Sequence, residues 1–351
     1  MRYQLLGRSG LKVSSLCLGT MTFGEESGFG ASQAECARIF DAFVAAGGNF
    51  IDTANLYTNG TSERFLADFI AAERTRLVVA SKFTMTMNAA DPNAGGNSRK
   101  NLQQSLDATL KRLRTDYLDL YWVHAWDQLT PLDELLRALD DAVRAGKILY
   151  TGFSNVPAWT VARAQTLAEL SGWTRFVALQ LHYSLVERNV ERELVPCAAA
   201  LGMAVTAWSP LAGGVLSGKY SDDAAVRAGQ PGRLTTTNWG RLFMSERNLA
   251  IARVVRQHAD RLGRSGAQVA IRWLLQRPCG AIPIIGARSA AQLQDLIGAE
   301  GFELDTEALT ALDAASAIDI GYPGSLLGSA GGNRMVHGEH GAVGATRACS
   351  H

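Results

Sequence analysis

The chain has 351 residues, of which 47% are hydrophobic and 19% are charged, and its formal net charge at pH 7 is +1. This near-neutral balance argues against a nucleic-acid-binding surface, and no apolar run reaches the roughly 18 residues that a membrane-spanning helix needs. The N-terminus lacks the apolar segment of a secretory signal, and the five cysteines are scattered without metal spacing, as in a reduced chain. We therefore expect a cytoplasmic protein with a large core, no metal site, and a small molecule rather than nucleic acid or membrane as its partner. The sequence does not specify an oligomeric state.

Short apolar segments rich in branched and aromatic residues alternate with segments of helical periodicity. The segments that we expect to form strands buried on both faces are 16–20, 49–54, 76–82, 117–124, 148–154, 176–181, 203–209 and 280–286. Most of their starts recur about every 25 to 40 residues, which is the size of one strand–helix unit. Eight such units predict the α/β class and a closed (β/α)8 TIM barrel, with an N-terminal β-hairpin cap and a long loop after the seventh strand. The alternative is a doubly wound open sheet, which usually carries a glycine fingerprint after its first strand; CLGTMTFG (17–24) is not one.

Helix boundaries are indicated at several places along the chain. Ser32 and Glu35 have the spacing of a capping box before an apolar-periodic segment that stops at Gly47. Pro131 opens another helical segment and Gly146 closes it. The alternation of predicted strands and helices is interrupted by an insertion from Leu211 to about Met244. Long loops in compact domains tend to be functional. We assign residues 1–324 to the barrel domain. Residues 325–351 are Gly-rich and carry no sequence pattern, and we expect them to form a flexible tail.

Polar residues stand where the predicted strands end, which is where the chemistry of such a barrel lies. Asp52, Lys82 and His124 end the second, third and fourth strands, and Tyr57 follows Asp52 in the next loop. A buried carboxylate costs free energy unless it is paired, so we expect Asp52 to pair with Lys82. A nearby ammonium favours phenolate and lowers the pKa of a tyrosine, which would suit Tyr57 as a general acid. His124 could then bind and orient a carbonyl oxygen.

The motifs DTANLY (52–57), ASK (80–82), WVH (122–124), GFSN (152–155), ALQLHYSL (178–185), AWSPLAGGVLSGKY (207–220) and IPIIGARSAAQLQDL (282–296) occur in this order. Together they resemble the aldo-keto reductase superfamily over roughly residues 1–323. The segment LLGRSGLKVSSLCLGTMTFG (5–24) resembles the bacterial branch that includes potassium-channel β-subunit-like reductases. The resemblance implies an NADPH-dependent reductase of aldehydes or ketones, reversible toward alcohol oxidation. Its catalytic residues would be Tyr57, Asp52, Lys82 and His124, with Tyr57 as the proton donor.

The resemblance also implies a cofactor site. Ser154, Asn155 and Gln180 would hold the carboxamide, and Trp208 would stack on the nicotinamide ring where many relatives carry tyrosine. The full set of expected cofactor-binding residues is Gly19, Thr20, Met21, Asp52, Ser154, Asn155, Gln180, Trp208, Ser209, Pro210, Leu211, Gly213, Ser217, Lys219, Gly286, Arg288, Gln292 and Asp295. The assignment of the residues that bind the adenosine end of the cofactor is also supported by the local sequence. Ser289 has the position of a helix N-cap, with Gln292 three positions later. A helix N-terminus beside Arg288 suits the 2′-phosphate of NADPH rather than NADH.

Aromatic side chains in or beside the loops that follow the strands are typical walls of a pocket for apolar or aromatic carbonyls. We expect substrate contacts from Phe23, Tyr57, Phe83, His124, Trp126 and Trp239. Two rival functions remain open: a cofactor-binding regulatory subunit with negligible turnover, and a barrel aldolase in which Lys82 forms a Schiff base.

Overall fold

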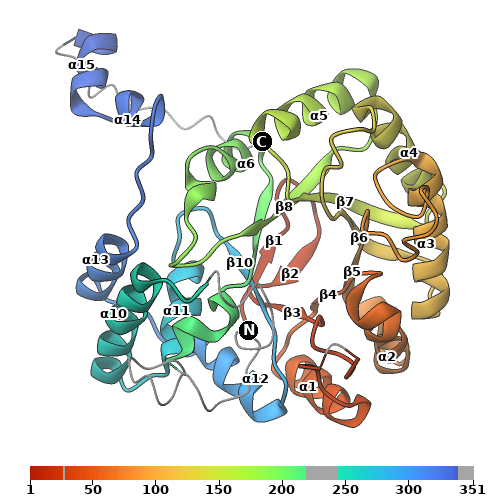
Figure 1. Cartoon of the computed structure of the whole chain (residues 1–351), viewed down its shortest axis with the longest axis horizontal. Helices are drawn as coiled ribbons and strands as arrows, with labels where there is room; N and C mark the ends of the chain where they lie inside the picture. The colour runs from red at the N-terminus through yellow and green to blue at the C-terminus, as the bar shows by residue number, and fades with distance from the viewer. Residues whose placement is uncertain (27, 219–242, 339–351) are drawn as a thin grey trace.

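The computed structural model describes residues 1–26, 28–218 and 243–338. Parallel strands close into a barrel in the order β10-β3-β4-β5-β6-β7-β8-β9, which confirms the predicted (β/α)8 barrel and excludes the open sheet (Figure 1). The barrel strands are β3 (Cys17–Gly19), β4 (Phe50–Asp52), β5 (Val78–Phe83), β6 (Leu118–Val123), β7 (Ile148–Ser154), β8 (Phe176–His182), β9 (Ala204–Trp208) and β10 (Ile282–Ile285). Each lies within or within one residue of a predicted segment, because strands covered on both faces read as continuous apolar runs.

Helices surround the barrel, and their apolar faces pack on the outer faces of its strands (Figure 1). The main helices are α1 (Gln33–Ala45), α2 (Thr61–Ile70), α3 (Arg99–Leu113), α4 (Leu132–Arg144), α5 (Ala158–Ser171), α6 (Leu194–Leu201), α10 (Glu246–Leu262), α11 (Gly266–Leu275), α12 (Ala290–Ile297) and α13 (Thr306–Ala315). No helix in the described part of the chain is long and apolar enough to cross a membrane.

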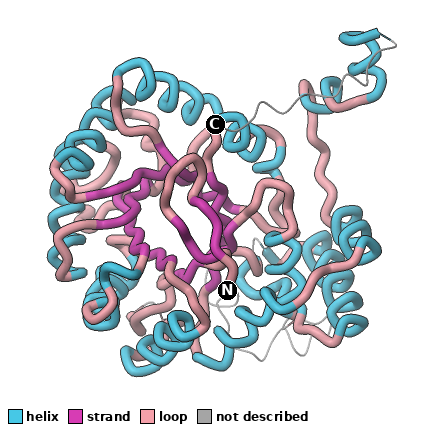
Figure 2. Tube along the Cα trace, turned by 180° about the vertical axis from the view of Figure 1, so that it is seen from behind, coloured by secondary structure: helices cyan, strands magenta, loops and turns pink. Residues whose placement is uncertain are grey.

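A second, smaller core fills the inside of the barrel. The antiparallel hairpin of β1 (Tyr3–Leu5) and β2 (Lys12–Ser14) closes the amino end of the strands (Figure 2). Leu6 and Val13 from this hairpin are fully buried against interior residues that include Trp122. Since the predicted hairpin cap covers this end, the opposite, carboxyl end of the barrel forms the mouth at which a ligand can enter.

The predicted capping box of α1 is wrong. Ser32 is the N-cap residue, but its side chain accepts no capping hydrogen bond. Glu35 instead reaches across to α12, where its Oε1 accepts a hydrogen bond of 2.8 Å from the backbone N–H of Ala290. A carboxylate at the first turn of a neighbouring helix satisfies an N–H that has no partner within that helix and also interacts favourably with the helix dipole.

The sequence of residues 325–351 showed no helical pattern, but the structure contains short helices in the described part of this segment. Two short helices, α14 (Gly324–Leu327) and α15 (Ala330–His337), extend away from the barrel (Figure 1). Ser329 starts the second by accepting a hydrogen bond of 2.9 Å from the N–H of Gly332. A serine N-cap thus overrides the glycine-rich composition here. Residues 339–351 lie outside the described residues.

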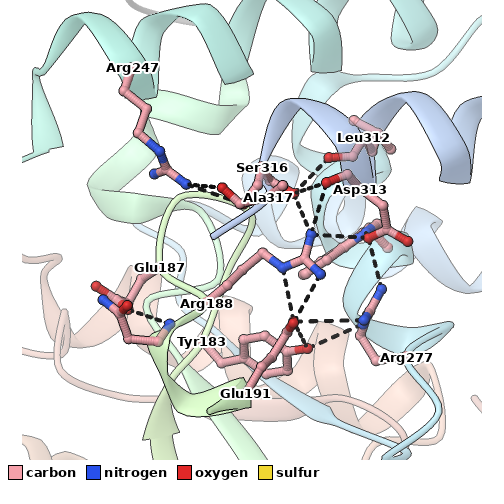
Figure 3. Close-up of polar contacts among 12 residues, drawn as sticks. Tyr183, Glu187, Arg188, Glu191, Arg247, Arg277, Leu312, Asp313, Ser316 and Ala317 are labelled. Atoms are coloured by element: carbon pink, nitrogen blue, oxygen red, sulfur yellow. Dashed lines mark hydrogen bonds and ion pairs between the residues drawn. The ribbon is translucent and has the colours of Figure 1, made fainter. Parts of the chain in front are cut away.

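A charged cluster fastens the segment after β8 to the C-terminal helices, as Figure 3 shows. Arg188 is 8% exposed and forms ion pairs with Glu191 at 2.9 Å and Asp313 at 3.2 Å. Arg277 pairs with the same Asp313 at 2.8 Å, and the hydroxyl of Tyr183 donates to Glu191 at 2.6 Å. These contacts hold a mouth-side loop in place from the outer side of the barrel.

Candidate active site

A buried ion pair lies at the mouth. Asp52 at the end of β4 and Lys82 in β5 are 2% and 0% exposed, and the Lys82 ammonium donates directly to Asp52 Oδ2. Lys82 Nζ also donates to the carbonyl of Thr53 at 2.9 Å and to the hydroxyl of Tyr57 at 3.0 Å. Gln180 Nε2 donates to the other oxygen of Asp52 at 3.0 Å. The pairing that we predicted from the cost of a lone buried carboxylate is therefore present.

The surroundings of Lys82 keep it charged. Burial alone would lower the pKa of Lys82, but the charge of Asp52, the electrostatic interaction with Tyr57 and the hydrogen bonds to both outweigh burial and raise it above its usual value. An amine must lose its proton before it can attack a carbonyl, and catalytic Schiff-base lysines accordingly have lowered pKa values. This environment therefore argues against the aldolase alternative and favours a permanent ammonium beside Tyr57.

Tyr57 and His124 face each other beside this pair. Tyr57 begins the short 3-10 helix Tyr57–Gly60, and its ring lies edge-on to that of His124, with centroids 6.3 Å apart and planes at 85°. Burial, with a smaller effect of the Lys82 charge, lowers the pKa of His124 to about 3. His124 is therefore a neutral imidazole at pH 7, able to donate one hydrogen bond without carrying a charge.

The expected carboxamide-binding residues are linked by hydrogen bonds to the predicted catalytic residues or to one another. Asn155 Nδ2 donates to the backbone carbonyl of His124 at 2.8 Å, and Ser154 Oγ donates to the carbonyl of Gln180 at 2.8 Å. Ser154 and Gln180 are buried, whereas Asn155 presents an exposed side chain at the mouth. Through these bonds the ends of β6, β7 and β8 are held in one arrangement around Asp52.

Trp208 ends β9 on the same side of the barrel and is partly exposed. The imidazole of His182 stacks on it, with ring centroids 4.1 Å apart and planes at 10°. The sequence analysis did not single out His182. Its position two residues after Gln180 was the available signal, because alternate residues of a strand share one face.

The remaining predicted cofactor residues fall into three places. Gly19, Thr20 and Met21 lie at the end of β3, where Thr20 is fully buried and its hydroxyl bonds to the Asp52 carbonyl and to Ser62. The turn after β9 contains Ser209, Pro210 and Leu211 and then the 3-10 helix Ala212–Ser217, which includes Gly213 and Ser217. The start of α12 carries the others, Gly286, Arg288, Gln292 and Asp295. Lys219 and Trp239 lie outside the described residues.

At α12, Gly286 and Arg288 are exposed, and Ser289 caps the helix by accepting a 3.2 Å hydrogen bond from Gln292 N. The Gln292 side chain accepts from the backbone N–H of Arg288 at 2.9 Å. Asp295 is engaged elsewhere: it accepts hydrogen bonds from Ser265 and Gln268 in the first turn of α11.

Two of the predicted substrate contacts are corrected by the structure. Phe23 is fully buried with its ring edge-on to Phe69, and Phe83 is fully buried and stacked on Tyr121 in the outer core. Neither ring is exposed in this structure. Trp126 is only half-buried, and its indole lies edge-on to that of Trp159, with centroids 5.2 Å apart.

Comparison with known proteins gives a consistent result. Residues 15–317 match the model of the Aldo/keto reductase family. Norsolorinic acid reductase stcV of Emericella nidulans is 36% identical over 91% of this chain and 82% of its own length. The oxidoreductase YrpG of Bacillus subtilis is 37% identical over 89% of this chain and 95% of its own, and an aryl-alcohol dehydrogenase [NADP(+)] of Phanerodontia chrysosporium is 31% identical over 95% and 90%. With the barrel and the mouth geometry, these matches show that the chain belongs to the aldo/keto reductase family and is an oxidoreductase.

Proposed function

We propose that this protein reduces an aldehyde or ketone to the alcohol, reversibly, with NADPH as cofactor and Tyr57 as proton donor. The observation that carries the proposal is the position of Lys82, whose ammonium contacts both the buried Asp52 and the hydroxyl of Tyr57. Such a contact stabilises the phenolate that remains after Tyr57 gives up its proton. A group arranged in this way is suited to general acid catalysis near neutral pH.

The exposed groups around the mouth fit a nicotinamide cofactor. Trp208 presents a partly exposed indole for stacking, and Asn155 an exposed amide for the carboxamide. The guanidinium of Arg288 is exposed beside the first turn of α12, and no described residue is hydrogen-bonded or ion-paired to it. A phosphate at this helix N-terminus would satisfy it, which supports NADPH over NADH. A relative named for NADP(+) agrees with this choice.

Each member of the catalytic group has one task in the reduction. When bound, the nicotinamide supplies the hydride that reaches the carbonyl carbon. Tyr57 donates its hydroxyl proton to the carbonyl oxygen, and Lys82, held by Asp52, stabilises the phenolate. The neutral His124 has a buried Nδ1 without a hydrogen-bond partner among the described residues. Its proton is therefore better placed on Nε2, where a carbonyl oxygen can accept it.

The proposed substrate class is apolar or aromatic carbonyl compounds. Trp126 lies two residues after His124 on the loop that follows β6 and remains half-buried. One relative is named for aryl alcohols, which are aromatic compounds, and another is named as a norsolorinic acid reductase. An aromatic wall beside the carbonyl-orienting histidine suits substrates of this kind.

The proposal is tested with a Tyr57→Phe variant, using Tyr150→Phe in β7 as the matched control. We expect Tyr57→Phe to bind NADPH as tightly as the wild type while its turnover of benzaldehyde falls by about 10²- to 10⁴-fold. Tyr150→Phe should match the wild type in both measurements. Full activity of Tyr57→Phe would disprove the proton-donor assignment. Tight NADPH binding by the wild type with turnover below about 0.01 per second on a broad aldehyde panel would favour the regulatory subunit instead.

A further inference from the structure

The turn that follows Tyr57 has a strained backbone. Thr58 and Asn59, in the 3-10 helix that Tyr57 begins, have φ angles of 44° and 52°, and the next residue, Gly60, has a φ of 81°. This left-handed region suits glycine, whereas a β-branched residue such as Thr58 is an outlier there. Strain of this kind persists only where surrounding contacts hold it, and it gathers at functional sites. We therefore expect contacts of Thr58 that hold the turn.

The hydroxyl of Thr58 makes two such contacts. Thr58 is 6% exposed, and its Oγ1 donates to the backbone carbonyl of Phe23 at 2.5 Å and accepts from the backbone N–H of Ser62 at 3.2 Å. The first bond joins the turn to the loop after β3. The second serves the first turn of α2, where a helix has no carbonyl of its own to offer. Gly24 leaves room for this contact, because a Cβ there would lie 2.9 Å from Thr58 Oγ1.

The same turn carries the proposed proton donor. Tyr57 directly precedes Thr58, and its hydroxyl accepts a hydrogen bond of 3.0 Å from Lys82 Nζ, which also lies 4.7 Å from the centroid of its ring. A change in the backbone at Thr58 would therefore move the base of the Tyr57 side chain. A shift of about 1 Å in a catalytic group can lower a rate by about 10²-fold.

We propose that Thr58 is a positioning residue, whose hydroxyl holds the strained turn in the conformation that directs the Tyr57 hydroxyl at Lys82. The inference rests on the proposed function, in which Tyr57 is the proton donor. Without the hydroxyl of Thr58, the buried Phe23 carbonyl would lose this donor and the backbone would relax toward an ordinary φ. The Tyr57 hydroxyl would then spend less time at the Lys82 ammonium, which slows proton transfer without weakening cofactor binding.

Three substitutions separate the hydroxyl from the strain. Thr58→Val removes the hydroxyl and keeps the branched side chain, whereas Thr58→Ser keeps the hydroxyl. Thr58→Gly removes the hydroxyl together with the strain, because glycine adopts a positive φ freely. Thr151→Val in β7 is the matched control. Thr151 is fully buried, and its hydroxyl also donates to a backbone carbonyl, that of Arg175 at 3.2 Å, but from a regular strand.

We expect Thr58→Val to lower kcat on benzaldehyde by about 10- to 100-fold and to leave the Kd for NADPH within about twofold of the wild type. Slower proton transfer should also raise the solvent deuterium isotope effect on kcat. Thr58→Ser and Thr58→Gly should retain most of the wild-type kcat, and Thr151→Val should match the wild type. If Thr58→Val does not fold, Thr58→Ala takes its place, because an unbranched side chain is less strained at this φ.

Crystal structures of the cofactor-free variants give a second readout, in which the Tyr57 hydroxyl leaves Lys82 in Thr58→Val and stays beside it in Thr58→Ser and Thr58→Gly. The inference is overturned if kcat is unchanged or the Tyr57 hydroxyl is unmoved in Thr58→Val. It is also overturned if Thr58→Ser or Thr58→Gly is as impaired as Thr58→Val. If Tyr57→Phe keeps full activity, the proposed function fails, and the place of the Tyr57 hydroxyl in Thr58→Val still decides whether Thr58 positions it.

Discussion

Replacing Lys82 by methionine tests whether the Asp52–Lys82 pair is a true buried ion pair. The substitution leaves the Asp52 carboxylate, 2% exposed, with Gln180 Nε2 as its remaining side-chain donor. An uncompensated buried charge of this kind costs about 3–5 kcal/mol. The Thr53 carbonyl also loses the donor that reached it at 2.9 Å, which adds about 1 kcal/mol. We therefore expect Lys82→Met to lower the free energy of unfolding by about 4–6 kcal/mol.

Urea denaturation at pH 7, followed by circular dichroism, measures this loss. Lys147→Met is the matched control, because Lys147 pairs with Asp107 at the surface, with side chains 37% and 52% exposed. That substitution should cost less than about 1 kcal/mol. The double variant Asp52→Asn/Lys82→Met should recover part of the loss, since a neutral amide needs no counter-charge. The reasoning would be refuted if Lys82→Met were as stable as Lys147→Met. It would also be refuted if the double variant lost as much stability as the Asp52→Asn and Lys82→Met single variants lose together.

Three further predictions follow from single contacts. Arg288→Ala should raise the KM for NADPH about 10-fold or more and leave that for NADH unchanged, as steady-state kinetics with both cofactors will show. Glu191→Gln should destabilise the protein by about 1–3 kcal/mol at pH 7. Burial raises the pKa of Glu191, but hydrogen bonds from Arg188 and Tyr183 outweigh burial, so the pKa of Glu191 is lowered in the folded state. Its contribution is therefore fully present above the unfolded pKa and lost as pH falls through the folded one. The difference in denaturation midpoint should shrink steadily as the solution is acidified below the unfolded pKa. Gly152→Ala should destabilise by about 1–3 kcal/mol or more in the same assay, because a Cβ there would lie 2.3 Å from the Trp122 ring.

The strands were predictable because each is covered on both faces and is therefore a continuous apolar run. Helix ends were less predictable, since a polar side chain can leave its own helix for a distant partner. Glu35 has the spacing of a capping box, yet it bonds to Ala290, 255 residues away along the chain. Local spacing contains no information about such a contact. The helix that starts at Ser329 was missed for the opposite reason, because we weighed glycine content above one serine N-cap.

The clustering of Asp52, Tyr57, Lys82 and His124 was predictable from the positions at which neighbouring parallel strands end. Phe23 and Phe83, which we expected beside them, are instead buried in the outer core. Phe83 follows Lys82 directly in β5, so if Lys82 points into the barrel, Phe83 must point out toward the helices. The same alternation places His182 beside Gln180 in β8. Strict use of the two-residue period would have excluded Phe83 and included His182.

The same alternation decides which of the two buried carboxylates that contact β5 belongs to the site. Ser81 and Lys82 are adjacent, and each contacts a buried carboxylate: Ser81 donates to Glu63 at 2.6 Å, and Lys82 to Asp52. Glu63 is fully buried and also pairs with Arg112 at 2.5 Å, so burial and pairing do not distinguish it from Asp52. Glu63 lies on α2, outside the barrel wall, where its bonds join helices to a strand. Asp52 lies inside the wall, where the ammonium that it holds reaches a tyrosine at the mouth. A buried ion pair supports the proposed reactive centre here only because the strand face directs it toward the mouth of the barrel, where a substrate could enter.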